Sequence, residues 1–473
     1  MAEFRTDLRV LRNPQAYASS GSVRHAMIAV LLATLLLPIH PSFAGLRIDP
    51  YRILLLIAIA PLCFGVLSGR AGRANFVDAT MFGFSAWIFI TLVYHHGNSR
   101  IPYALISAVE LLGGYLAGRL LVRSAEDYRI FLRYFMWSLL ILMPFAFIEL
   151  VTGHVPISEF FQRFVEVTPK IIDERFNLVR AQTVFPHPIL FGVFCTVPFA
   201  SIYFLSKGRL SMLVRLTVVC LTTFTSLSSA AFLSILAQGG LILWGKLTRD
   251  RWWLLIGIAG FIFLSLEILS NRGPIILLIE KFTLSPETAW WRVYIWIYGT
   301  QNVLTNPIMG IGLNDWVRPY WLADTVDNFW LVIAMRHGLP AFVFVALGIT
   351  VHITRMVRAK LATDELVQIR KGYMISLVGL LLTLCTVHAW DALTVVVMFI
   401  IGAGSFLYQK PQMAVALTKN AGSGIGLTHE LKGQAPAQVI TPPSDIEVPV
   451  RKILPYSRFA ANRTRSGNDR RPL

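Results

Sequence analysis

The sequence predicts an all-α polytopic membrane protein with about twelve transmembrane helices and a large outer loop between the ninth and tenth of them. The 473-residue chain is 55% hydrophobic and only 15% charged, which is too apolar for a soluble domain. Its apolar residues form runs of about 20, the length that a helix needs to cross a bilayer. A helix satisfies its own backbone hydrogen bonds, so we expect one helix for each run.

The apolar runs define a membrane domain at 25–408, between a basic arm at 1–24 and a tail at 409–473. Each run ends at a connector rich in basic residues, Pro, Gly, Ser or Thr. The expected spans are 25–44, 51–67, 76–94, 101–121, 130–151, 187–205, 210–225, 227–245, 252–270, 327–350, 373–389 and 392–408. The tail is rich in Gly, Pro and Ser and cannot bury a core, so we expect it to be disordered in the cytoplasm.

Lys and Arg residues gather in alternate connectors, and this asymmetry predicts the orientation of the chain. With a cytoplasmic N-terminus, every connector that follows an even-numbered span faces the cytoplasm and carries most of the basic residues. Both termini are then cytoplasmic, and the loops at 152–186 and 271–326 face outward. The net charge of +17 therefore reflects topology, and we expect no nucleic-acid partner.

The four cysteines lie inside apolar runs without paired spacing, so they imply neither a disulfide nor a metal site. The first apolar run lacks a small-residue cleavage site and is followed by further spans, so we expect no cleavable signal peptide. We expect no cofactor.

The outer loop at 271–326 concentrates polar, charged and aromatic residues between two membrane spans. Its Arg292 and the Arg180 of the other outer loop are candidates to bind phosphate with a bidentate guanidinium fork, or else to contact lipid headgroups. The tryptophans of the loop offer flat faces that can stack on sugars, or they form an interfacial belt. These residues are Trp290, Trp291, Trp296, Trp316 and Trp321.

Asp327 and Asn328 stand at the outer mouth of the next span. Asp327 is a candidate to accept a proton from a hydroxyl group, and its alternative role is to cap the helix. Arg336 lies roughly 13 Å along the same span if the helix is continuous. An ionised residue at such depth faces a wet cavity, here one that receives phosphate, or it pairs with Glu110 or Glu149.

His187 and Asn328 are further candidates for substrate binding. His187 lies between two prolines at the start of a span, a position that also suits a structural role. His388 and Asp391 fall in what the pattern predicts to be a short outer turn.

These motifs, taken in order, resemble the O-antigen ligase and Wzy-type polysaccharide polymerase family of bacterial membrane glycosyltransferases. The likeness covers about residues 50–405. It rests on Arg180 before a Phe-Pro-His-Pro segment, a Ser-rich span (SLSSAAFLSIL), and Arg292 in the main loop. It also rests on the turn Asn306-Pro307-x-x-Gly310-x-Gly312 and on the later Gly338-Leu339-Pro340.

The resemblance implies metal-independent transfer of an undecaprenyl-diphosphate-linked oligosaccharide to an acceptor glycan or a lipid A core. The transfer would take place at the periplasmic face of the inner membrane, next to membrane lipid, with a flippase and a chain-length regulator as partners. By this resemblance Arg180 and Arg292 hold the diphosphate. Ligases of the family carry His-Asn where this chain has Asp327-Asn328, which favours a polymerase of O-antigen or exopolysaccharide.

A transporter or flippase of the same lipid-linked glycan is the alternative from another class. Transporters show repeats and helices broken near the middle of the membrane. The sequence shows no repeat, and its polar residues are concentrated outside the membrane, so the enzyme is the preferred prediction.

Overall fold

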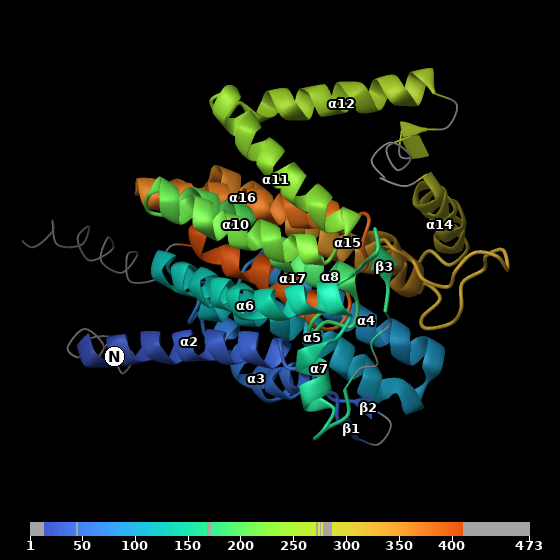
Figure 1. Cartoon of the computed structure of the whole chain (residues 1–473), viewed down its shortest axis with the longest axis horizontal. Coiled ribbons are helices and arrows are strands. Elements are labelled where there is room, and N and C mark those ends of the chain that lie inside the picture. The colour runs from blue at the N-terminus through green and yellow to red at the C-terminus, as the bar shows by residue number, and fades with distance from the viewer. Residues whose placement is uncertain are drawn as a thin grey trace, which may run out of the picture. The chain divides into compact units, whose positions relative to one another are not determined.

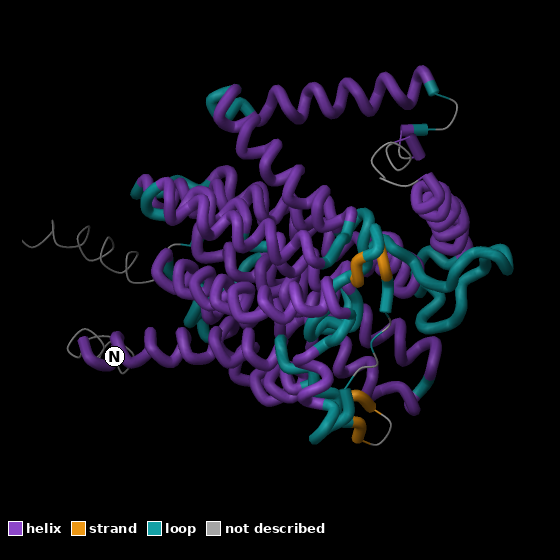
Figure 2. The backbone as a smooth tube through the Cα atoms, viewed as in Figure 1, coloured by secondary structure: helices purple, strands orange, loops and turns teal. Residues whose placement is uncertain are grey.

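The computed structural model describes residues 14–43, 46–167, 170, 172–270, 273–274, 276–277 and 286–409, and most of them are helical (Figures 1 and 2). The α-helices are α2 (Pro14–Leu35), α3 (Pro50–Leu67), α4 (Phe76–His96), α5 (Ile101–Leu121), α6 (Ala125–Thr152), α7 (Pro156–Phe161), α8 (Pro188–Thr196), α9 (Phe199–Leu205), α10 (Arg209–Thr225), α11 (Ser229–Leu247), α12 (Trp252–Leu269), α14 (Pro286–Thr305), α15 (Phe329–Arg358), α16 (Asp364–Thr383) and α17 (Ala392–Ala403). Short 3₁₀ helices precede α5 (η1, Asn98–Arg100) and follow α17 (η2, Gly404–Leu407).

The described strands form two antiparallel pairs, and each strand is two residues long. β1 (Ser42–Phe43) pairs with β2 (Leu46–Arg47), and β3 (Glu174–Arg175) pairs with β4 (Leu178–Val179). Both pairs lie in connectors between helices. The predicted tail at 410–473, the first part of the basic arm (1–13) and most of 271–285 lie outside the described residues.

Within the described residues, nine helices are long and apolar enough to cross a membrane: α3, α4, η1 with α5, α6, α8 with α9, α11, α12, α15 and α16. Two shorter apolar helices cover Gly21–Leu35 and Ala392–Leu407. The chain is therefore a multi-pass membrane protein with an all-α fold, as the sequence predicts. The sequence placed one span at 373–389, but α16 begins earlier because Thr363 caps its first turn with a side-chain oxygen.

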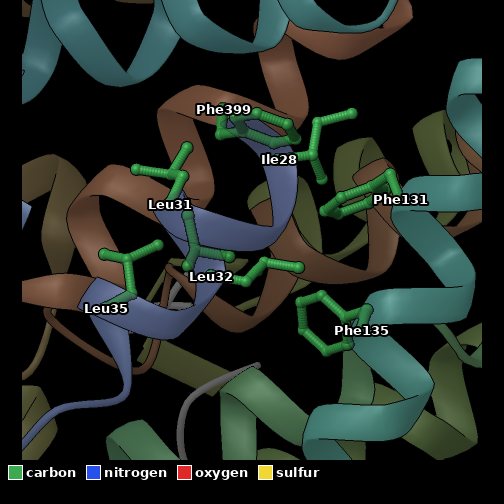
Figure 3. A pocket seen from close by; sticks show the side chains of 8 residues that line it. Ile28, Leu31, Leu32, Leu35, Phe131, Phe135 and Phe399 are labelled. Atoms are coloured by element: carbon green, nitrogen blue, oxygen red, sulfur yellow. The ribbon is translucent and has the colours of Figure 1, made fainter. Parts of the chain in front are cut away.

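The first helix shows how apolar spacing fixes the packing. Ile28, Leu31, Leu32 and Leu35 of α2 recur at helical spacing and point toward phenylalanines of α6 and α17 (Figure 3). The void among them is about 10 Å³, room for at most one water molecule. This region is therefore packed core and holds no ligand site. At the centre, α17 is buried over nearly its whole length.

The connectors gather at two ends of the helices. We call the end with the connectors at 36–49, 97–100, 153–187, 226–228, 306–328 and 384–391 the loop end. There, for example, the His40 amide donates to the Glu166 carbonyl over 3.1 Å. The other end, with the connectors at 68–75, 122–124, 206–208, 248–251 and 359–363, is the basic end. Ion pairs such as Arg129–Glu365, at 2.6 Å, lie close to it.

Candidate functional site

Helix α15 is broken in its first half. Gly338 has φ 75° and ψ 174°, which interrupts the helix, and Pro340 supplies no amide hydrogen for the preceding turn. A side chain at Gly338 would place its Cβ 1.9 Å from the Ile308 carbonyl oxygen, so only glycine fits. The span predicted at 327–350 is therefore interrupted at Gly338, so the depth of about 13 Å for Arg336, which assumes a continuous helix, does not apply.

The turn at Asn306–Gly312 fills the break and satisfies the freed backbone. The Leu339 amide donates to the Pro307 carbonyl over 2.7 Å. The Met335 and Arg336 carbonyls accept the amides of Ile311 and Gly312, each at 2.9 Å. Non-helical backbone within a membrane protein is tolerated where protein covers it or where it lines a cavity. The two glycine-containing motifs thus form one structural unit.

Arg336 directly precedes this break and is exposed. Neither carboxylate that the sequence offered as its partner is bound to it. Glu110 pairs with Arg52 at 2.6 Å, and Glu149 accepts backbone amides. The ion-pair alternative for Arg336 is therefore wrong, and its guanidinium lines a cavity instead.

The cavity has a volume of about 440 Å³, within the range of small-molecule sites. Its deep walls are apolar and come from α4, α5 and α15: Phe84, Ile88, Leu92, Ile106, Leu111, Val332 and Ile333. Four arginines line it as well: Arg47, Arg52, Arg100 and Arg336. An apolar chamber with cations suits a ligand that has an anionic head and a hydrocarbon chain.

The four arginines of the cavity differ in their partners. Arg52 pairs with Glu110 and, at 3.1 Å, with Asp391. Arg47 pairs with Asp49 at 3.0 Å and with Asp391 at 3.4 Å. Among the described residues, Arg100 and Arg336 form no ion pair. These two cations are therefore the ones available to an anionic ligand.

A second cluster at the loop end gathers four of the predicted site residues. Arg180 is 5% exposed; its Nη1 contacts Asp173 at 2.5 Å, and its Nε donates to the Ser226 carbonyl over 3.2 Å. Burial lowers the pKa of Arg180, and Asp173 opposes that shift. Arg180 is thus held firmly between two loop-end connectors.

His187 caps α8, with Nδ1 accepting the Ile189 amide over 3.2 Å. Burial and the charge of Arg180 lower the pKa of His187, while the carboxylate of Asp327 raises it. Burial also lowers the pKa of Arg292, and Asp327 again opposes the shift. The charge of His187 therefore interacts with those of Arg180 and Asp327, and the charge of Arg292 interacts with that of Asp327.

Asp327 does not cap α15. The cap is Asn328, whose side-chain oxygen accepts the Leu331 amide over 3.0 Å. Asp327 is one residue too early for that contact. The capping alternative for Asp327 is therefore wrong, and the capping role that we find for Asn328 is structural.

The tryptophans of the large loop fall into two groups. Trp316 is 6% exposed, and its indole N–H donates to the Asp324 carbonyl over 3.0 Å, so it supports the loop and offers no free face to a sugar. Trp291 and Trp321 are 42% and 43% exposed, with ring centroids 6.0 Å apart. Sugar stacking, predicted for the tryptophans of the loop, is therefore closed to Trp316 and stays open to Trp291, to Trp321 and to Trp290, which is 44% exposed.

Trp390 lies between the cavity and the second cluster. Its ring is 6.0 Å from that of His187 and 5.8 Å from that of His388, which stacks on Phe329. Trp390, His388 and Phe329 all line the cavity. Burial and the charge of Arg336 lower the pKa of His388 to about 4, so this ring is neutral at pH 7. The aromatic rings of Trp390, His388 and Phe329 therefore connect the cavity to the second cluster.

Sequence reasoning missed several of these residues. It did not single out Arg100 as a site residue, and it assigned His388 and Asp391 to a turn. A charged residue close to an apolar run, such as Arg52 or Glu110, was the available signal, because such groups usually face a partner or a cavity.

No protein-family model and no curated protein matches the chain. In the part of the chain that the structure describes, no group of three or more His, Cys, Asp or Glu residues could hold a metal ion. The function therefore has to be argued from the geometry and charges of the site itself.

Proposed function

We propose that the protein is a glycosyltransferase of the bacterial inner membrane. It transfers an undecaprenyl-diphosphate-linked glycan to an acceptor sugar hydroxyl at the periplasmic face, as a polymerase of O-antigen or exopolysaccharide. The observation that carries the proposal is the arginine-lined apolar cavity of about 440 Å³, joined through Trp390 to the cluster of Arg180, His187, Arg292 and Asp327.

In this proposal the chain crosses the membrane twelve times. The nine long apolar helices provide nine of these spans, and the helices α2, α10 and α17 provide the other three. The basic end faces the cytoplasm, in keeping with the excess of Lys and Arg in its connectors, and both termini lie on that side. The loop end, with the large loop at 271–326, faces the periplasm.

The cavity binds the donor lipid. Its apolar walls hold the first part of the polyprenyl chain, and Arg100 and Arg336 bind the diphosphate oxygens. Guanidinium groups suit this role because they bind phosphate with two parallel hydrogen bonds. The glycan then points toward Asp327, with Trp291 and Trp321 as surfaces for its sugars.

The transfer needs one bond to form and one to break. The acceptor oxygen forms a bond to the anomeric carbon while the bond from that carbon to the diphosphate oxygen breaks. The hydroxyl proton passes to Asp327, and the electron pair leaves with the lipid diphosphate. Arg292 and Arg180 stabilise the developing negative charge, which is the largest catalytic term in many enzymes.

The test is polymer formation by the purified protein in detergent, with lipid-linked repeat units as substrate. Replacing Arg336 or Arg100 by Gln should raise the KM for the donor about 10–100-fold, the value of one or two charged hydrogen bonds. Arg163→Gln is the matched control, because Arg163 is an exposed arginine of the same end that does not line the cavity. If Arg336→Gln and Arg100→Gln have the same KM for the donor as Arg163→Gln, the cavity does not bind the donor.

A transporter or flippase of the same lipid is the second candidate, and the broken helix α15 favours it. The detergent assay separates the two functions. A polymerase lengthens the glycan without any membrane, whereas a flippase gives no new glycosidic bond. Lengthened products would exclude a transport-only function.

A further inference from the structure

Glu149 lies near the loop end of α6, is 1% exposed, and is bound to the backbone of another segment. Its Oε1 accepts the Gln182 amide over 3.1 Å, and its Oε2 accepts the Thr183 amide over 2.8 Å. One carboxylate therefore holds two consecutive peptide groups, an arrangement that fixes their orientation more tightly than a single bond.

The bound turn is strained. Thr183 has φ 50°, a left-handed conformation that is a genuine outlier for a β-branched residue. Its own hydroxyl is buried and has no hydrogen-bond partner among the described residues, so the side chain does not compensate for the strain. A strained backbone persists only where its surroundings hold it, and the two bonds to Glu149 provide that hold.

The same segment carries two residues of the second cluster. Arg180 lies three positions before Thr183, and His187 lies four positions after it. Further contacts fasten the segment on both sides of the turn: the Ala181 amide donates to the Thr225 carbonyl over 2.9 Å, and Lys170 Nζ donates to the Phe185 carbonyl. The direction in which Arg180 and His187 leave the backbone therefore depends on the turn at Gln182–Thr183.

We propose that Glu149 is a positioning residue, which holds the Arg180–His187 segment in the strained conformation that aligns Arg180 and His187 with Asp327 and Arg292. The role in catalysis rests on the proposed glycosyl transfer. Glu149 itself is buried and touches no substrate. Its effect on transfer passes through the backbone of Gln182 and Thr183.

Glu149→Gln tests the proposal, since its side chain keeps one acceptor oxygen and loses the other. Asp127→Asn is the control on the same helix, because Asp127 is also 1% exposed and accepts a backbone amide, that of Arg123, over 3.1 Å, in addition to its pairs with Arg24 and His25. Asp127 is near the opposite, basic end. Two readouts are measured on the full-length protein: hydrogen exchange of the peptide covering 180–187, and kcat and donor KM for polymer formation.

We expect exchange at Gln182 and Thr183 to rise about 10-fold in Glu149→Gln, as the loss of one buried hydrogen bond implies. We expect kcat to fall about 10–100-fold with little change in KM, because misaligned groups slow the chemical step. Asp127→Asn should change neither readout. Thr183→Gly removes the strain, so the double variant with Glu149→Gln should recover most of the kcat.

Unchanged exchange at Gln182 and Thr183 in Glu149→Gln would overturn the structural part of the proposal. Faster exchange with wild-type kcat, or an equal fall of kcat in Asp127→Asn, would overturn the positioning role. A wild-type protein that forms no polymer would refute the proposed function instead, and the exchange measurement would still decide whether Glu149 holds the turn.

Discussion

Replacing Asp327 by Asn removes a carboxylate from the site while leaving the start of α15 intact. The helix is capped by Asn328, whose side-chain oxygen is bound to the Leu331 amide at 3.0 Å. Asp327 is half-buried, and its side chain forms no hydrogen bond to the backbone of the residues that the structure describes. We therefore expect a loss of unfolding free energy of only about 1 kcal/mol, which comes from the attraction of the carboxylate to His187 and Arg292 and not from the helix cap.

The rate of transfer should respond quite differently. A general base contributes about 10²–10⁴-fold to a reaction, and the amide of asparagine cannot accept the proton. We expect kcat of Asp327→Asn to fall by about 10²-fold or more, which is at least about 3 kcal/mol of activation free energy. The assay is the initial rate of polymer formation by purified protein in detergent, at saturating donor.

Asn328→Ala is the matched variant at the neighbouring position. It removes the cap and should cost about 1 kcal/mol of stability while leaving the carboxylate of Asp327 in place. The two variants should therefore differ in opposite ways. Asp327→Asn should keep most of its stability but lose transfer rate, whereas Asn328→Ala should lose stability but keep a rate much closer to that of the wild type. A wild-type rate for Asp327→Asn would refute the assignment of Asp327 as the base.

Three further predictions concern orientation, charge geometry and pH. A topology reporter fused after Gln409 should be active only in the cytoplasm, and one inserted at the fully exposed Tyr320 only outside. Activity of both reporters in the same compartment would overturn the three spans, an odd number, that we place between these positions. Arg292→Lys and Arg180→Lys keep the charge but lose the bidentate guanidinium fork, so each should lower kcat/KM by about 10-fold at normal expression. Polymer of wild-type length and amount in both variants would show that these arginines are not part of the site. Burial lowers the pKa of Lys170 to about 8. The charge of Arg47 lowers this pKa further, and the charge of Glu149 raises it. In the unfolded chain the lysine keeps its ordinary pKa of about 10.4. Between these two values the unfolded state binds more protons, so stability should rise with pH across this window by up to about 3 kcal/mol. Thermal unfolding at pH 8 and pH 10 should show the rise in the wild type and not in Lys170→Met.

Hydropathy was sufficient to predict an all-helical, multi-pass membrane protein. The helix α5 covers 101–121, as the sequence predicts, and α3 and α12 differ from their predicted bounds by one residue. Each of these runs has polar or basic residues at its ends, so composition alone fixes where the helix stops. Gly338 and Pro340 mark a point where the helix of this span could break, but composition could not show that α15 does break there, because a glycine and a proline also occur in uninterrupted apolar runs.

Side-chain roles at the site were harder to predict, because they depend on which atoms a fold brings within 3 Å. Asp327 and Asn328 are equally good capping residues by type, and only the backbone decides that Asn328 receives the Leu331 amide. In the same way, nothing in the order of residues separates the buried Trp316 from the exposed Trp291. The charges of His187 and Arg292 both interact with that of Asp327, although Arg292 lies within α14 and Asp327 in the connector before α15; the joint role of these residues in a site stays a prediction.

The turn at Asn306–Gly312 and the arginine-lined cavity depend on each other through Arg336. An arginine within an apolar helix is costly, by about 2.5–3.5 kcal/mol on insertion scales, unless it reaches a cavity or a partner. In an unbroken helix the Arg336 carbonyl would accept an amide four residues later, but that residue is Pro340, which has none. The amide of Gly312 replaces it at 2.9 Å, and the turn that brings Gly312 there also packs against Gly338. The helix can therefore open at the point where Arg336 meets the cavity, and the turn binds the Met335 and Arg336 carbonyls and the Leu339 amide at the break. A side chain at Gly338 would expel the turn, so the position of this arginine in the cavity depends on a glycine two residues away.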